Sequence, residues 1–134
     1  MRNIFILTCL LFINICSAQQ NESSNNVDGP FTIVEEMPSF KGGDTEMVKF
    51  IQKNVKYPQA EKEAGITGTC FVTFIVEKNG KLGEIKILRG VSGGPGLDKE
   101  ALRVVKKMPK WKPGRQNGKK VRVQYNLPIK YTIR

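Results

Sequence analysis

The sequence predicts an α+β fold: a three-stranded antiparallel sheet with helices packed on one face, in a split β-α-β arrangement. Three observations carry this prediction. Apolar and polar residues alternate over Gly68–Glu77, Leu82–Leu88 and Lys119–Ile133, as in strands with one buried face. A helical repeat of apolar residues over Leu97–Met108 separates the second strand from the third. The chain has 134 residues, 40% hydrophobic and 25% charged, which suits one globular domain with one core.

The last strand sets the predicted strand order. The alternation runs from Val121 to Tyr131, about 35 Å at roughly 3.4 Å per residue. Pro128 has no N–H to donate to a neighbouring strand, which favours an edge position. The helix Leu97–Met108 returns the chain, so the last strand runs antiparallel to Gly68–Glu77 and can pair beside it. The predicted order is therefore second, first, third.

The segment before the sheet begins with Phe31–Glu36, which is predicted as a short strand. If it paired with the last strand, it would block the open edge. An amphipathic helix follows, with Asp44 or Thr45 as its N-cap, and it ends at Tyr57 because the next residue is proline. Its apolar stripe consists of Met47, Phe50, Ile51 and Val55. A second short helix starts at Pro58, with Ala60 and Ala64 predicted to face inward.

The hairpin and the second helix carry clear local signals. Asn79-Gly80 predicts a tight turn between the first two strands. Ile85 and Ile87 are expected on the inner face of the return strand. The later helix buries the stripe Leu97, Ala101, Val104, Val105 and Met108. Trp111, the single tryptophan, is expected to close one end of the core rather than to stack on a ligand.

Residues 1–18 have the features of a secretory signal peptide. Arg2 supplies the positive start, Ile4–Ile15 is an apolar run of 12 residues, and Ala18 precedes the expected cleavage point. The alternatives are a lipid anchor at Cys16 and an uncleaved segment that keeps the protein at the inner membrane. Residues 19–30 are polar and predict a flexible tail. Residues 31–134 are the predicted domain.

The charge is distributed unevenly. The net charge is +10, all 12 acidic residues lie at or before Glu100, and 11 lysines and arginines follow from Ala101 onward. This block favours an anionic partner, namely an acidic peptide, a nucleic acid or an anionic lipid surface, or else it is a solvated basic surface. Export from the cytoplasm argues against nucleic acid, and no row of exposed aromatic residues suggests base stacking.

The sequence gives little support for catalysis or a cofactor. It contains no histidine, and no cysteine-histidine cluster predicts a metal. Asp98 and Glu100 are two apart on a helix, so they do not face each other. Cys70 lies on the inner face of a strand and is expected to be a buried core residue. The glycine-rich loop Gly90–Gly96 lacks the spacing of a phosphate-binding loop. We therefore expect a binding module rather than an enzyme.

Several short motifs occur in a fixed order along residues 31–134. They are Val34-Glu35-x-Met37-Pro38-x-Phe40-x-Gly42-Gly43, Tyr57-Pro58 with Ala60 and Ala64-Gly65, Gly68-x-Cys70-x-Val72-x-Phe74-x-Val76, Asn79-Gly80, Leu97-Asp98-x-Glu100-Ala101, Met108-Pro109-x-Trp111-x-Pro113-Gly114, and Gly118-Lys119-x-Val121 running to Leu127-Pro128-Ile129. Together they resemble the C-terminal domain of TonB, in the version common as small exported proteins of Bacteroidetes-type bacteria.

The resemblance implies a periplasmic domain that binds TonB-dependent outer-membrane receptors and supports energy-coupled import of nutrients such as siderophores, vitamins or glycans. In that family the N-terminal segment of the receptor adds as a strand to the edge of the last strand, a mode called β-augmentation. The positions that would bind the partner are Lys120, Val121, Arg122, Val123, Gln124, Tyr125, Asn126 and Leu127. Among them Arg122, Gln124 and Asn126 are expected to face solvent and to contact side chains of the guest.

The chain departs from a full-length energy transducer of that family. Its apolar segment has the features of a cleavable one, and residues 19–30 reach at most about 40 Å. Contact with inner-membrane motor proteins would then need other subunits. The alternative functions are an exported basic interaction module without energy transduction, or a homodimer joined through the last strands.

Overall fold

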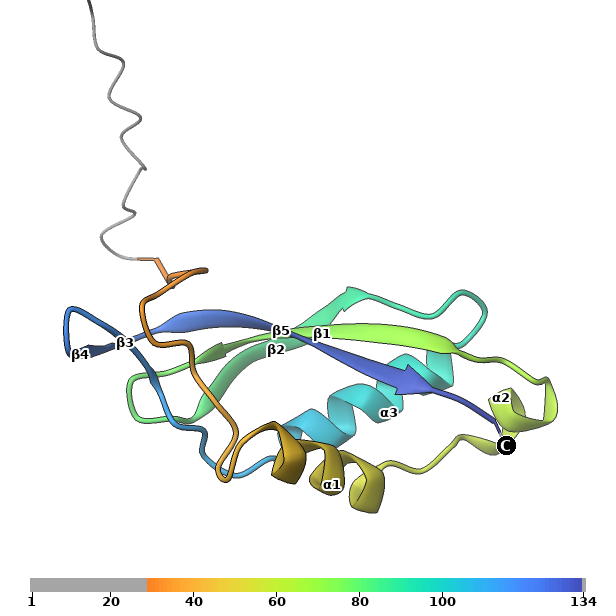
Figure 1. The fold of residues 1–134 in the computed structure, drawn as a ribbon. Coiled ribbons are helices and arrows are strands. Elements are labelled where there is room, and N and C mark those ends of the chain that lie inside the picture. Colours follow the sequence, from red (N-terminus) through yellow and green to blue (C-terminus); the bar gives the residue numbers. More distant parts are fainter. Residues whose placement is uncertain (1–28, 134) are drawn as a thin grey trace, which may run out of the picture.

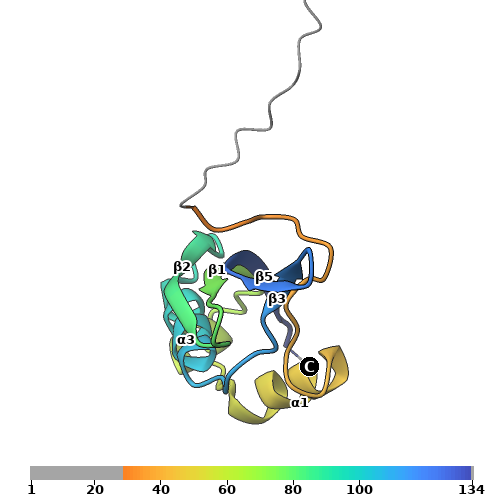
Figure 2. The same ribbon diagram turned by 90° about the vertical axis from the view of Figure 1, so that its left-hand side faces the viewer.

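The computed structural model describes residues 29–133. A three-stranded antiparallel sheet has the order β2 (Leu82–Arg89), β1 (Gly68–Val76) and β5 (Val123–Tyr131). Helices α1 (Asp44–Asn54) and α3 (Pro95–Lys106) lie on the same side of this sheet (Figures 1 and 2). The predicted fold class, the strand order and the edge position of the last strand in the sheet are confirmed. The predicted segment 1–18 and most of the tail 19–30 lie outside the described residues.

Strand β1 is central because both of its faces can be buried. Cys70, Val72, Phe74 and Val76 point toward the helices and are at most 1% exposed. On the opposite face Ile75 is also buried, at 4% exposure. A strand that is apolar on both faces gains most from a position between two neighbours.

A β-bulge changes which side chains of β2 face the core. Thr73 pairs with Lys86 and Ile75 pairs with Gly83, so one more residue lies between the two pairs on β2 than on β1. Glu84 takes up the irregularity with a positive φ of 47°. The extra residue allows Leu82 and the predicted inward residues, Ile85 and Ile87, all to pack against the core.

The β1–β2 turn depends on a glycine. Gly80 has a φ of 83°, which favours glycine, and a Cβ there would lie 2.2 Å from the Trp111 carbonyl oxygen. The Gly80 carbonyl accepts the Trp111 N–H at 2.8 Å. The predicted Asn79-Gly80 turn is confirmed. It also positions the indole, which is 3% exposed and packs edge-on against the rings of Phe40, Phe74 and Tyr125.

The apolar stripes of α1 and α3 pack on the core as predicted, but α1 has Gly43 as its N-cap instead of Asp44 or Thr45 and ends at Asn54, before the predicted Tyr57. The pattern of α2 (Gln59–Glu63) differs more. The prediction that Ala60 and Ala64 face inward is wrong, since both are exposed, while Glu61 is only 7% exposed. Glu61 is buried because its carboxylate accepts a hydrogen bond from Gly96 N–H of α3, as described below. Helix α3 starts two residues earlier than predicted, with Pro95 in its first turn. None of the helices in the described part of the chain is both long and apolar enough for a membrane crossing.

The prediction of one uninterrupted last strand from Val121 to Tyr131 is wrong. The chain forms β4 (Lys119–Val121), breaks at Arg122 and continues as β5. Strand β4 pairs with β3 (Gly114–Gln116) in a separate two-stranded hairpin. The reason is local, because the Asn117-Gly118 turn folds β4 back on β3 before the chain reaches the main sheet.

Candidate strand-docking edge

The backbone of β5 is paired on one side by β1. Nine consecutive residue pairs join the two strands without a register shift, from Gly68 with Tyr131 to Val76 with Val123. Successive residues of a strand direct their N–H and C=O groups to opposite sides. Gln124 N–H points away from β1, because it is bonded to Phe31. Asn126, Pro128 and Lys130 therefore direct their backbone groups outward as well.

Residues 29–40 form an N-terminal strap that covers the start of this edge. The Phe31 N–H donates to the Arg122 carbonyl at 2.9 Å, and the Gln124 N–H donates to the Phe31 carbonyl at 2.7 Å. Beyond Phe31 the strap leaves β5 and makes bridges from Glu36 to Arg115 and from Ser39 to Lys112. Figure 2 shows it passing from the top of the sheet down to α1.

The position of the strap tests two expectations from the sequence: that Phe31–Glu36 is a strand, and that it covers the last strand. The prediction of a strand over Phe31–Glu36 is wrong, since only isolated bridges form there. The concern that this segment covers the last strand is correct for one position only, because Phe31 is its single bridge to β5. The part of the edge beyond Gln124 has no backbone partner within residues 29–133. The outward groups of Asn126, Pro128 and Lys130 are called the open edge below.

The predicted binding residues 120–127 do not act as one surface. Lys120 and Val121 belong to the hairpin, where they pair with Arg115 and Gly114. Val123, Tyr125 and Leu127 point toward the helices. Of the whole predicted set, only Asn126 is exposed and has outward backbone groups without a partner in the described chain.

Arg122, which was expected to contact side chains of a guest, is already engaged within the domain. Its guanidinium donates to both carboxylate oxygens of Glu77, at 2.7 and 3.2 Å. This bidentate bond raises the pKa of Arg122 and fixes the side chain across the end of β1. Gln124 is also engaged, since its Nε2 donates to Thr73 Oγ1 at 3.2 Å.

Sequence reasoning missed the true position of the open edge. Pro128 and Lys130 are exposed on it, whereas the predicted site ended at Leu127. Pro128 was the available signal, because proline has no N–H and therefore fits an edge strand only where the backbone groups of that residue point away from the neighbouring strand. Pro128 is opposite Phe71 of β1, and this residue pair exchanges no backbone hydrogen bonds, so the absent N–H of Pro128 leaves no acceptor on β1 without its donor.

The opposite edge of the sheet is less suitable for an added strand. Its register with β1 shifts twice, between Phe71 and Val72 and between Thr73 and Ile75. Bulges twist a strand and interrupt the regular spacing of its hydrogen-bonding groups. Strand β5, whose register with β1 has no shift, is the better template.

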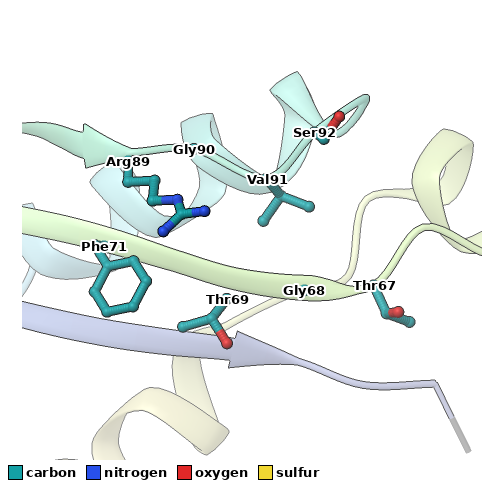
Figure 3. Close-up of a pocket in the computed structure, with 8 residues that line it drawn as sticks. All are labelled: Thr67, Gly68, Thr69, Phe71, Arg89, Gly90, Val91 and Ser92. Atoms are coloured by element: carbon teal, nitrogen blue, oxygen red, sulfur yellow. The ribbon is translucent and has the colours of Figure 1, made fainter.

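A hollow of about 770 Å³ lies where β1 begins and β2 ends (Figure 3). Its lining residues are Thr67, Gly68, Thr69, Phe71, Arg89, Gly90, Val91 and Ser92. None of them is a carboxylate, a cysteine or a histidine, so the Ser92 hydroxyl has no base beside it in this lining. The hollow therefore gives no support to a hydrolytic or acid–base site.

The remaining reactive groups are structural. Cys70 is fully buried, and burial together with a hydrogen bond to Asp98 raises the pKa of its thiol to about 12. Burial also raises the pKa of Tyr131, whose hydroxyl donates to the Leu97 carbonyl at 2.9 Å. Residues 29–133 contain no group of three histidine, cysteine or acidic side chains that could hold a metal ion.

A family model for the C-terminal part of the TonB protein of Gram-negative bacteria matches residues 53–133. The chain belongs to this family. Strands β1, β2 and β5 and helix α3 all lie within the matched residues. The strap and the first part of α1 precede the match.

Two solved structures have a similar fold, both solution structures of the TonB C-terminal domain of Helicobacter pylori. The first is 22% identical with a TM-score of 0.50, and the match covers 66% of this chain and 90% of that one. The second is 20% identical with a TM-score of 0.50 and covers 67% and 79% of the two chains. At this identity the likeness shows the fold alone. Comparison with curated proteins gave no match.

Proposed function

We propose that this protein is an exported, periplasmic binding domain that takes the N-terminal segment of a TonB-dependent outer-membrane receptor as an added strand on β5. The observation that carries the proposal is the open edge, which lies beside nine regularly paired residues and has no partner within residues 29–133. Such an edge is otherwise a liability for aggregation, so a strand meant to pair there is its natural explanation. The role would be support of energy-coupled nutrient import, with motor contact supplied by other subunits.

The open edge predicts a weak complex. It offers the N–H groups of Asn126 and Lys130 and the carbonyls of Asn126, Pro128 and Lys130. At about 1 kcal/mol net for each bond, roughly four or five bonds only just exceed an association cost of at least ~4 kcal/mol. Additional free energy would come from attraction between Lys130 and an acidic guest residue.

Because the strap pairs with the start of β5, the length of the guest strand determines whether Phe31 is displaced. A short guest pairs with the open edge and leaves Phe31 in place. A longer guest replaces Phe31 and regains the two bonds that Phe31 makes with Arg122 and Gln124, so the exchange is close to neutral in hydrogen bonds. Phe31 is 39% exposed, so its release also exposes the buried remainder of the ring, and a longer guest must compensate for this with apolar contacts of its own.

Peptide titration followed by amide NMR tests the proposal. The probes are synthetic peptides of the N-terminal segments of the TonB-dependent receptors encoded in the same genome. We expect shifts at Asn126 and Lys130. In Asn126→Pro the outward donor is lost while the bonds to β1 remain, so affinity should fall at least about fivefold, the equivalent of one hydrogen bond. Asn126→Ala keeps the N–H and is the matched control.

A second variant tests the strap. Phe31→Pro removes the N–H that donates to Arg122, so long peptides should associate faster and the Gln124 amide should exchange faster with solvent. If no peptide perturbs the open edge, or if Asn126→Pro binds as well as Asn126→Ala, the proposal fails. Sedimentation of the same proteins decides the homodimer alternative, since a dimer through β5 would dissociate in Asn126→Pro.

A further inference from the structure

Four segments of the chain come together toward the end of the molecule where β1 turns into β2, namely this turn, the end of α3, the segment after α3 and the β3–β4 hairpin. The Gly80 carbonyl accepts the Trp111 N–H at 2.8 Å, which holds the turn against the segment after α3. The bond between Glu77 and Arg122 holds the same turn beside the β3–β4 hairpin. Figure 1 shows the hairpin and this turn together at one end, with the C-terminus at the other.

This end carries a concentration of lysines, called the lysine end below. Its members are Lys78, Lys81, Lys106, Lys107, Lys110, Lys112, Lys119 and Lys120, all exposed. None of them forms an ion pair within residues 29–133. The acidic side chains near this end are Glu77, which is bound to Arg122, Glu84, whose charge acts on Arg122, Asp44, whose charge acts on Tyr125, and Glu35 and Glu36 of the strap. Positive charge therefore strongly exceeds negative charge here.

The lysine end offers no discrete anion site. A hollow of about 430 Å³ at this end is lined by Glu77, Lys78, Asn79 and Arg122. Its carboxylate and guanidinium bind each other, so they are not free to hold a small anion. The strap also carries exposed apolar side chains beside this end, namely Phe31, Ile33 and Met37, since Glu36 pairs with Arg115 of the hairpin.

We propose that the lysine end binds an anionic phospholipid surface. Flexible lysines spread over four segments match a layer of mobile headgroups, which can rearrange beneath them, better than they match a fixed array of carboxylates on a folded partner. The attraction is electrostatic and lies within a Debye length of the surface, so it is sensitive to salt.

Binding by this end would leave the open edge accessible. Strand β5 begins at Val123 beside the hairpin and ends at Tyr131 near the opposite end (Figure 1). The open edge therefore leads away from the surface, and a guest strand and a membrane can be bound together. The lipid proposal does not depend on strand addition, and either can fail alone.

Vesicle sedimentation tests the inference with the chain from Gln19 onward. This chain keeps the whole sheet and core but omits the apolar segment Ile4–Ile15, which would itself bind lipid. We expect binding to vesicles with about 30% phosphatidylglycerol and no binding to pure phosphatidylcholine. Binding should be lost at about 0.5 M salt, where the Debye length falls to a few ångströms.

Two double variants separate a local effect from a change in net charge. Lys119→Ser with Lys120→Ser should weaken partitioning about 25-fold, since each lysine near an anionic surface contributes about fivefold. The control removes two exposed lysines of α1 and α2, Lys53→Ser with Lys62→Ser, and should change it less than about threefold. Equal losses in both variants, or no preference for anionic vesicles, would overturn the inference. Tighter binding to poly-glutamate than to vesicles would assign the lysine end to an acidic protein segment instead.

Discussion

The contact between Glu61 and Gly96 predicts that Gly96→Ala destabilises the parent protein but stabilises the Glu61→Ala variant. The Glu61 carboxylate is 7% exposed and accepts the Gly96 N–H at 2.7 Å. Gly96 is in the first turn of α3, whose N-cap residue, Gly94, makes no side-chain cap bond. Glu61 of α2 therefore supplies, from another helix, the negative group that an N-terminus favours.

The magnitudes follow from this geometry. Glu61→Ala removes a hydrogen bond to a charged group and should lower the free energy of unfolding by about 1.5–3 kcal/mol. In Gly96→Ala the new Cβ would lie 2.3 Å from Glu61 Oε1 and 2.6 Å from Oε2, so the carboxylate must move and the bond is lost. Alanine regains about 1 kcal/mol of helix propensity, which leaves a net loss of about 0.5–2 kcal/mol.

In the Glu61→Ala background the same Gly96→Ala change meets no carboxylate. It should then stabilise the protein by about 1 kcal/mol, because the propensity gain is no longer opposed. Urea unfolding of the four proteins measures the coupling, which we expect to be about 1.5–3 kcal/mol. Additive effects, with Gly96→Ala equally costly in both backgrounds, would refute this account of how α2 is tied to α3.

Two further predictions concern titratable groups. Because burial and Asp98 raise the pKa of the Cys70 thiol to about 12, Cys70 should resist alkylation at pH 8 in the folded protein and react fully in denaturant; rapid labelling of the native state would contradict its burial. The hydrogen bond from Arg103 lowers the pKa of Glu100, so its stabilisation is present above the pKa of the unfolded state and is lost as the pH falls through the folded pKa. Glu100→Gln should thus be less stable than the parent chain in urea at pH 7 and equal to it in acid, and a difference independent of pH would show that the ionised carboxylate is not responsible.

Periodicity predicted most of the fold because it reports burial. The alternation in β1 and β5, the helical stripe of α3 and the turn at Gly80 were each read correctly from local residues. The direction of the chain and Pro128 then left one consistent strand order. These features depend on the residues that form them, not on distant partners.

The wrong predictions concern which partner a segment pairs with or packs against, which periodicity does not report. Alternation over Val121–Tyr131 indicates an extended chain but not which strand it pairs with, so the division between β4 and β5 was missed. Ala60 and Ala64 were predicted to face inward because the partner that buries Glu61 instead, Gly96, is 35 residues away. The single bridge of Phe31 to Val123 is too short to leave a periodic signal.

The two shifts of register in β2 bear on how far association can proceed. A sheet with two receptive margins can stack copy upon copy into a fibril, as repeated edge pairing does in amyloid. Here the β2 edge has two register shifts and the β5 edge has none. One guest strand, or one second copy of the chain, therefore occupies the only edge of this sheet that is regular enough to pair. Assembly would stop at that step, so the chain can keep an unpaired strand edge without forming fibrils.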